Sequence, residues 1–147
     1  MIELDEYIKQ DIYKPKYLFH GTSNKVDILE LRKSIDNRNK DNEDNAIFLT
    51  SSFITAAAYA FSRKLKKNNE CYSFSINNNG KLPIMTFEVD NLPDDLEAYI
   101  YIFKKEANMI KDSHKFTTQY RCYSNLKTKN YIKVTYKDFE KYFERII

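Results

Sequence analysis

The chain of 147 residues is long enough for one domain that buries roughly two thirds of the surface of the unfolded chain. Hydrophobic residues make up 42% and charged residues 31%, which excludes a disordered chain, and the net charge of +3 is too small to indicate nucleic-acid binding by itself. No apolar run approaches the roughly 18 residues of a membrane span, and the acidic N-terminus is unlike a signal peptide, so we expect a single cytoplasmic domain over 1–147 without a membrane partner.

The first half of the chain favours helices joined by two short strands. Apolar spacing predicts an amphipathic helix over 3–13 that ends before Pro15. The segment "KYLFHGTS" predicts a strand that enters a turn, "VDILELRKS" predicts a short helix, and 36–45 predict a polar loop. The segment "AIFLTSS" predicts a second strand, which leads into a helix over 53–67 that is rich in alanine and contains no breaker.

The helix over 53–67 has one aromatic residue outside its apolar stripe. The stripe expected to face the core consists of Ile54, Ala58, Phe61 and Leu65. Tyr59 lies about 140° from the start of this stripe around the helix. Its neighbours there are Ser52, Thr55, Ala56 and Arg63. We therefore expect Tyr59 to be more exposed than a core ring, either as an ordinary surface residue or as part of a site.

The second half of the chain favours strands. Strands are predicted in "CYSFSI", "LPIMTFEVD", "AYIYIFK", "TTQYRCYS" and "NYIKVTYK", and the last two alternate well enough to be paired. A closing amphipathic helix is predicted in "KDFEKYFERII". Its inward residues are Phe139, Tyr142, Phe143 and Ile146. Because helices come mostly first and strands mostly later, the order favours an α+β fold over alternating βαβ units.

His20 and Gly21 form a notable pair at the end of the first strand, because the chain has only 2 glycines. A glycine most often serves a positive φ or a tight turn, and it can also let a ligand approach the backbone. A lone histidine is more often a structural hydrogen-bonding residue than a catalyst. No GxGxxG or P-loop pattern is present, and we expect no metal site, because the two histidines and two cysteines lack metal-binding spacing. Cys71 and Cys122 are expected to be buried free thiols.

Three segments occur in a recognisable order: "FHGTS", "FLTSSFITAAAY" and "TTQYRCYS". In this order they resemble the ADP-ribosyltransferase family, specifically the His-Tyr-Glu branch that includes diphtheria toxin and the poly(ADP-ribose) polymerases. The resemblance spans 17–136. It implies an α+β fold with a split β-sheet core and flanking short helices, and it implies NAD as the substrate.

The resemblance assigns the first motif to NAD. His20 would hold a ribose hydroxyl on the adenosine side, Gly21 would present backbone groups to the nicotinamide amide, and Thr22 would support the turn. The missing Cβ of Gly21 would let the amide approach the backbone.

The second motif supplies Phe48 and Tyr59, which by the same resemblance sandwich the nicotinamide ring. Thr50 belongs to the same F-x-T-x(8)-Y pattern and is assigned to the NAD site with them. Ala56 also falls in this site, at the position where some members bind the nicotinamide amide through a serine. That contact is missing here.

The third motif places Gln119 where the family has a glutamate at the start of a late strand. The glutamate stabilises the positive charge that develops on the ribose as nicotinamide leaves. Gln119 can accept a hydrogen bond from the 2′-hydroxyl but carries no charge, and losing one such group commonly costs about 10²–10³ in rate. In a regular strand, Gln119, Arg121 and Tyr123 share one face. The carboxylates that could substitute are Glu97, Glu106 and Asp112.

The leading hypothesis is a small mono-ADP-ribosyltransferase that transfers ADP-ribose from NAD to a protein or nucleic-acid acceptor, with Gln119, His20 and Tyr59 as catalytic residues. One alternative is a domain that binds NAD or ADP-ribose and transfers nothing. Another is an unrelated α+β interaction domain in which His20 and Tyr59 are structural. The related branch that transfers an RNA 2′-phosphate to NAD needs further His and Arg residues, and only His114 follows His20. Without a linked delivery domain, an exported multidomain toxin is not expected.

Overall fold

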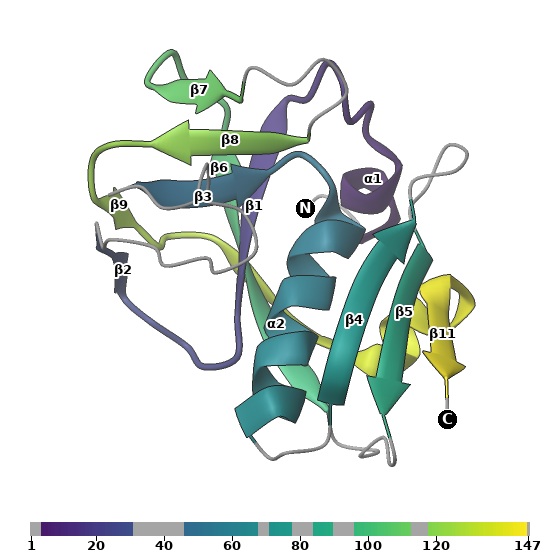
Figure 1. Cartoon of the computed structure of the whole chain (residues 1–147). Coiled ribbons are helices and arrows are strands. Elements are labelled where there is room, and N and C mark those ends of the chain that lie inside the picture. The colour runs from purple at the N-terminus through teal and green to yellow at the C-terminus, as the bar shows by residue number, and fades with distance from the viewer. Residues whose placement is uncertain are drawn as a thin grey trace.

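The computed structural model of the chain describes residues 4–30, 46–67, 71–77, 84–89, 96–112 and 118–146. Within these ranges the fold is mixed α+β and mostly antiparallel, with two α-helices (Figure 1). The helices are α1 (Leu4–Lys9), α2 (Phe53–Lys67) and a 3₁₀ helix, η2 (Tyr136–Tyr142). The general class is the one that the sequence predicted.

Six strands form the larger sheet, in the order β10-β6-β1-β3-β8-β7, and each neighbouring pair is antiparallel. These strands are β1 (Tyr17–Thr22), β3 (Ile47–Thr50), β6 (Glu97–Lys104), β7 (Met109–Lys111), β8 (Gln119–Cys122) and β10 (Tyr131–Thr135). The strands that carry the three sequence motifs, β1, β3 and β8, are consecutive in the sheet. Segments far apart in the chain therefore lie side by side.

Two smaller sheets complete the described fold. One contains β4 (Cys71–Asn77), β5 (Ile84–Val89) and β11 (Phe143–Ile146), with β11 parallel to β5. The other pairs β2 (Ile28–Leu29) with β9 (Leu126–Lys127). Helix α2 contacts β1 and β6 of the larger sheet and β4 of the smaller one, so it is packed between two sheets (Figure 1).

The larger sheet is buried on both faces. On the face that α2 covers, the ring of Phe19 meets the ring of Phe53 edge-on at 5.0 Å, and Phe53 stacks on Phe139 at 5.9 Å. Leu18 and Leu49 belong to a second buried cluster on the opposite face. Because side chains alternate along a strand, the neighbours Leu18 and Phe19 supply one core each.

Most of the predicted elements are confirmed, among them the strands β1, β3, β4, β5, β6, β8 and β10 and the helix over 53–67. The stripe residues Ile54, Ala58 and Phe61 are buried. Cys122 is buried with a free thiol, as expected. The structure does not describe the side chains of Leu65 and Cys71.

Two predictions for the N-terminal part are wrong. The segment predicted as a helix over 26–34 contains β2, because Ile28–Leu29 pair with β9, and the rest of it from residue 31 lies outside the described ranges together with the loop 36–45. The first helix ends at Lys9 instead of reaching residue 13. The carboxylate of Asp11 accepts hydrogen bonds from the backbone N–H groups of the next turn and diverts the chain from the helix.

Two predictions for the C-terminal part are also wrong. The segments "TTQYRCYS" and "NYIKVTYK" do not pair with each other, because β8 lies between β3 and β7 whereas β10 pairs with β6. The closing helix is the 3₁₀ helix η2, which is followed by β11 because the end of the chain completes the smaller sheet beside β5. Phe139 is buried as expected. The side chains of Tyr142, Phe143 and Ile146 are not among those described.

Candidate functional site

Gly21 lies where α2 packs against β1, and the helix explains the glycine. A Cβ built on Gly21 would lie 2.1 Å from the carbonyl oxygen of Ala56 and 3.1 Å from the Cβ of Ala60. The obstacle at Ala56 is backbone, which no side-chain rotation can move. The missing Cβ therefore makes room for α2, whereas the family resemblance implied that a ligand would use that room. Ala56 is itself in the buried core against β1, so its methyl group does not line an open site.

The hydrogen-bonding direction of the peptide groups alternates along β1. The N–H of Lys105 donates to the carbonyl of Lys16, which makes this position a hydrogen-bonded pair between β6 and the start of β1. Every second residue of β1 after Lys16 then directs its peptide groups toward β6. The intervening residues Tyr17, Phe19 and Gly21 direct theirs toward β3. Gly21 thus presents one donor and one acceptor to the β3 side.

The first of these outward positions is paired by a side-chain amide. Nε2 of Gln10 donates to the carbonyl of Tyr17 at 2.8 Å, and Oε1 of Gln10 accepts from the N–H of Tyr17 at 3.2 Å. Nε2 also donates to the carbonyl of Ser51 at 2.7 Å. A carboxamide can therefore pair with this edge of β1 through both of its groups. Nothing in the sequence pointed to Gln10.

The pairing between β1 and β3 is limited to one position in the part of the chain that the structure describes, Phe19 with Thr50. On β3, the N–H of Ser51 donates to the carbonyl of Thr118, which pairs Ser51 with the residue that precedes β8. By the same alternation, Phe48 and Thr50 direct their peptide groups toward β1. Phe48 is therefore oriented to continue the ladder, yet no ladder pair forms there.

A histidine side chain takes the place of the next ladder bond. If the register continued, Gly21 would oppose Phe48, but the carbonyl of Phe48 accepts instead from Nδ1 of His20 at 2.7 Å. The ladder between β1 and β3 ends at this contact. The peptide groups of Gly21 and the imidazole of His20 consequently lie at the same end of the β1–β3 ladder.

The hydrogen bond determines the protonation of His20. A carbonyl only accepts, so Nδ1 carries the proton and Nε2 is left as an acceptor when the ring is neutral. Burial lowers the pKa of His20 below its usual value of 6.5, the bond to Phe48 opposes this shift, and the charge of Arg63 adds to it. His20 is therefore neutral at pH 7, and Nε2 can accept a hydrogen bond from a hydroxyl group.

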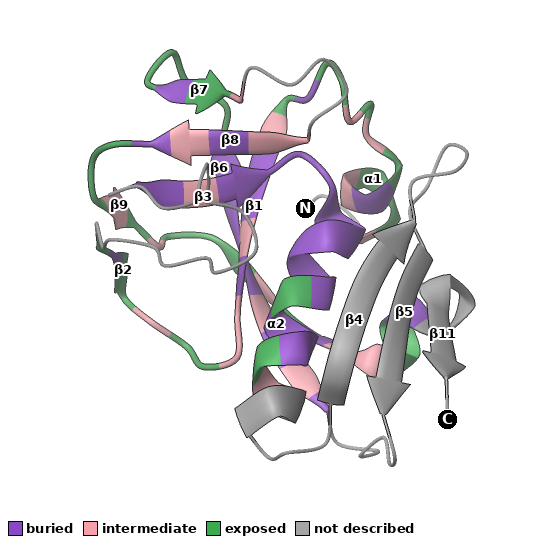
Figure 2. Cartoon of the chain, viewed as in Figure 1, coloured by how far each residue is buried: buried purple, intermediate pink, exposed green. Residues whose placement is uncertain are grey.

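Tyr59 is the exposed residue in a stretch of α2, from Phe53 to Ser62, that is otherwise buried (Figure 2). Its exposed fraction is 46%, which confirms that it lies outside the core stripe. Arg63 follows one turn later on the same flank of the helix. Helix α2, which carries both residues, packs against β1, the strand that contains His20.

The residues expected beside Tyr59 are less exposed than the helical pattern suggested. Ser52 and Thr55 are buried, because α2 packs against β4 as well as against the larger sheet. The hydroxyl of Ser52 accepts from the N–H of Thr55 at 3.1 Å and caps the start of the helix. The side chain of Ser52 therefore stabilises the start of the helix.

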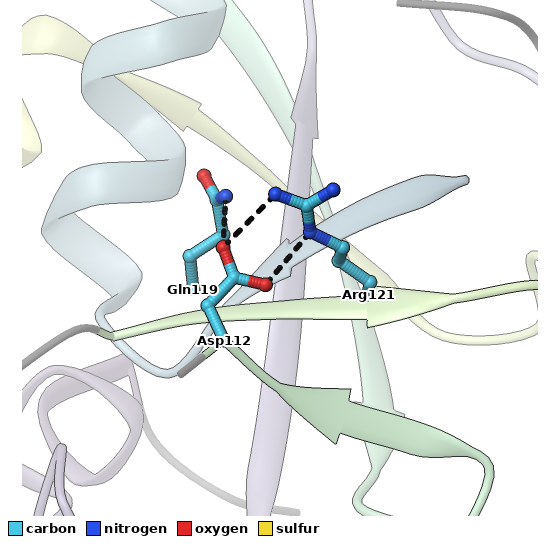
Figure 3. Close-up of polar contacts among 3 residues, drawn as sticks. All are labelled: Asp112, Gln119 and Arg121. Atoms are coloured by element: carbon cyan, nitrogen blue, oxygen red, sulfur yellow. Dashed lines mark hydrogen bonds and ion pairs between the residues drawn. The ribbon is translucent and has the colours of Figure 1, made fainter. Parts of the chain in front are cut away.

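Asp112, Gln119 and Arg121 form a hydrogen-bonded cluster on β8 and at the end of β7 (Figure 3). Nε2 of Gln119 donates to Oδ2 of Asp112 at 2.6 Å. Nε of Arg121 donates to Oδ1 of Asp112 at 2.8 Å, and its Nη2 lies 3.4 Å from Oδ2. The guanidinium of Arg121 lies over the ring of Phe48, 5.1 Å from its centroid, which joins the cluster to β3.

Gln119 is the first residue of β8, the position that the resemblance implied. Gln119 and Arg121 share a strand face, as predicted, since both contact Asp112, whereas Tyr123 lies beyond the end of β8 and is exposed. Asp112 opposes Gln119 because its backbone N–H donates to the Gln119 carbonyl, which extends the β7–β8 pairing. This contact was not predicted from the sequence, because β7 has only three residues and is too short to predict. If β7 had been predicted as the partner of β8, the register of that hairpin would have placed Asp112 opposite Gln119.

The other two carboxylates considered at this position do not meet Gln119. Glu97 forms an ion pair with Lys133 at 2.6 Å on the β6–β10 side of the sheet. Glu106 is exposed between β6 and β7. Asp112 is therefore the carboxylate that the fold brings to Gln119.

The remaining predicted residues have structural partners or lie outside the described ranges. The hydroxyl of Thr22 donates to the carbonyl of Asn24 and supports the turn after β1, as expected. Thr50 is buried, and its hydroxyl donates to Thr118 and accepts from the N–H of Ser52 at the junction of β3 and α2. His114 is outside the part of the chain that is described.

Comparisons with protein-family models, with curated proteins and with solved structures found no match to this chain. Among the residues whose positions are described, no three or more His, Cys, Asp or Glu side chains form a group that could hold a metal ion. None of the described helices combines the length and the apolar character needed to cross a membrane.

Proposed function

We propose that this chain is a mono-ADP-ribosyltransferase, which takes ADP-ribose from NAD and transfers it to a protein or nucleic-acid acceptor. The observation that carries the proposal is the end of the β1–β3 ladder at His20, where the peptide groups of Gly21 are directed toward β3 beyond the one described ladder pair. Tyr59 comes from α2, which packs against β1, and Gln119 comes from the start of β8, which is the neighbour of β3 in the sheet. In this proposal the larger and smaller sheets are the split core of the ADP-ribosyltransferase fold.

The edge of β1 is suited to a carboxamide. Gln10 already pairs with Tyr17 on this edge through one N–H and one C=O group. The nicotinamide carboxamide carries the same two groups, and Gly21 presents the same donor and acceptor four residues further along β1. Its N–H and C=O would therefore hold the nicotinamide amide in the same way.

In this proposal two aromatic rings sandwich the nicotinamide ring. Tyr59 extends from α2 as an exposed ring, and Phe48 lies on β3 with the guanidinium of Arg121 over it. Stacking of this kind contributes about 0.5–1.5 kcal/mol per ring beyond the area that is buried. The Arg121 contact keeps the Phe48 ring in a defined position before a ligand binds.

The proposed reaction breaks the bond between the nicotinamide nitrogen and C1′ of the adjoining ribose. The electron pair of that bond stays on the nitrogen of the departing neutral nicotinamide. A nucleophilic atom of the acceptor, or of water, forms the new bond to C1′ and releases its proton to solvent. Oε1 of Gln119 accepts a hydrogen bond from the 2′-hydroxyl of this ribose, and Nε2 of neutral His20 accepts one from the adenosine ribose.

The test is incubation of the purified chain with labelled NAD and cell lysate, with nicotinamide release and label transfer both measured. We expect both, and we expect Tyr59→Ala to weaken NAD binding by about tenfold through loss of stacking. Tyr13→Ala is the matched control, because Tyr13 is 48% exposed and lies outside the elements that border the site. Equal effects of the two substitutions would refute the stacking role of Tyr59. A chain that neither binds NAD nor releases nicotinamide would instead be an α+β interaction domain.

A second candidate is an NAD-binding domain that transfers nothing, and the uncharged side chain of Gln119 favours it. Without a negative charge at this position, the oxocarbenium-like transition state loses part of its stabilisation. Titration calorimetry with NAD distinguishes the two, since a binding domain would show affinity for NAD with no release of nicotinamide over hours.

A further inference from the structure

The carboxylate of Asp112 determines which way the side-chain amide of Gln119 points. An ionised carboxylate has acceptors only, so it must meet the NH₂ end of the amide, and Nε2 lies 2.6 Å from Oδ2. The carbonyl end of the amide, Oε1, then points away from Asp112, as Figure 3 shows. Gln119 by itself has no such preference, because both ends of an amide have nearly the same shape.

The position of Asp112 is in turn held by Arg121. The guanidinium of Arg121 contacts both carboxylate oxygens, at 2.8 Å and 3.4 Å. The exposed fractions of the two side chains are 16% for Arg121 and 17% for Asp112, so the pair is largely shielded from solvent. The carboxylate cannot turn away from Gln119 without losing these bonds.

We propose that Asp112 and Gln119 act as one unit in the proposed transferase, with Asp112 as a positioning residue that turns Oε1 of Gln119 toward the ribose of NAD. This inference rests on the proposed function. The unit replaces the single glutamate of the resembling family with a carboxylate and an amide on opposing strands. The oxygen that meets the ribose 2′-hydroxyl belongs to Gln119, and its direction is imposed by Asp112.

The unit predicts an unexpected result for Gln119→Glu. Judged from the sequence, this substitution restores the family's glutamate and should raise the rate. In the folded chain it would place a second carboxylate at hydrogen-bond distance from Asp112, where two like charges cannot both be accommodated and one must take up a proton. We therefore expect Gln119→Glu to be slower than the unaltered chain, increasingly so as the pH rises.

The double substitution Asp112→Asn with Gln119→Glu reverses the donor and the acceptor of the pair. The new amide at 112 can accept from Nε of Arg121 through its oxygen and donate to the new carboxylate through its NH₂ group. The bond between residues 112 and 119 and the bond from Nε of Arg121 are thereby preserved, the longer contact of Arg121 Nη2 is lost, and the carboxylate moves to the position of the ribose contact. Asp112→Asn alone lets the amide of Gln119 turn round, so that its NH₂ group faces the ribose.

The experiment measures the rate of nicotinamide release, with water as acceptor, across pH 6–9 for the unaltered chain, the two single variants and the double variant, together with NAD affinity. We expect each single variant to lose about tenfold or more in kcat, with a smaller change in KM. We expect the double variant to recover at least the rate of the unaltered chain and to keep that rate at high pH. Glu97→Gln, which breaks the ion pair with Lys133, is the matched control and is expected to leave kcat unchanged.

The outcomes separate this inference from the proposed function. Two results would overturn the role of the pair alone, provided that the unaltered chain binds NAD. One is an unchanged kcat for Asp112→Asn. The other is a Gln119→Glu variant that is faster than the double variant at every pH. Failure of the unaltered chain to bind NAD would overturn the proposed function and this role with it. Unfolding curves of all variants show that loss and recovery of rate are not loss and recovery of fold.

Discussion

The Nδ1 atom of His20 donates to the backbone carbonyl of Phe48 at 2.7 Å, and this side-chain bond stands where the next bond between β1 and β3 would have formed. One contact thus ends a ladder, fixes the tautomer of the imidazole and leaves the peptide groups of Gly21 directed toward β3 beyond the last described ladder pair. The proposed NAD site depends on this interruption, because a fully paired sheet would offer no backbone groups to a ligand.

Substitution of Gly21 by alanine is expected to destabilise the fold. The added methyl group would meet the carbonyl oxygen of Ala56 at 2.1 Å, so α2 or β1 must shift, and overpacking of this kind costs about 1–3 kcal/mol. Urea unfolding of Gly21→Ala measures the loss. Adding Ala60→Gly serves as a control and should not restore stability, because the main obstacle is the backbone of Ala56. A Gly21→Ala chain as stable as the unaltered one would contradict the close packing of α2 on β1.

The stability of the fold is expected to depend on pH through His20. Burial lowers the pKa of His20 in the folded chain, so between that pKa and the usual value of 6.5 the unfolded chain binds more protons at this residue. The free energy of unfolding should therefore fall as the pH drops below about 6.5 and level off below the lowered pKa.

The His20→Gln variant isolates this contribution, because His114 is present in both chains and its effect cancels. Urea unfolding at several pH values should show the unaltered chain losing its stability relative to His20→Gln as the solution becomes more acidic. A difference between the two chains that stays constant from about pH 8 to pH 5 would be inconsistent with a neutral, half-buried imidazole.

Replacement of Gln10 by glutamate is expected to destabilise the junction of α1, β1 and α2. Nε2 of Gln10 donates to the carbonyls of Tyr17 and Ser51, and a carboxylate in its place would turn an acceptor toward two acceptors. Leaving partly buried carbonyls unpaired in this way costs about 1–3 kcal/mol, which thermal unfolding can measure. Glu6→Gln makes the reverse exchange at an exposed position of α1 and should change stability by less than about 0.5 kcal/mol. Similar small effects for both variants would argue against the Gln10 bridge.

Local sequence patterns were sufficient for many of the elements and for one side of the candidate site. The strand β6 was predicted from its continuous apolar run, and α2 was predicted from its high alanine content. Both signals are properties of residues that are adjacent in the sequence. The exposure of Tyr59 followed from helical periodicity alone, which requires only the geometry of one element. The place of Gln119 at the start of β8 was implied by the family resemblance.

Tertiary structure decided what depends on two distant segments meeting. Ile28 and Leu29 lie in a segment whose apolar spacing predicts a helix, but they form a strand because β9 lies beside them. Gly21 is required by the backbone of α2, which begins more than thirty residues later in the chain. The residues around Gly21 do not show how closely α2 approaches it in the folded chain. Asp112 meets Gln119 only through the register of β7 and β8, which sets which residues are opposite each other. The periodicity of apolar residues indicates which face of one segment is buried. The partner of a polar side chain depends on which distant segments the folded chain brings together.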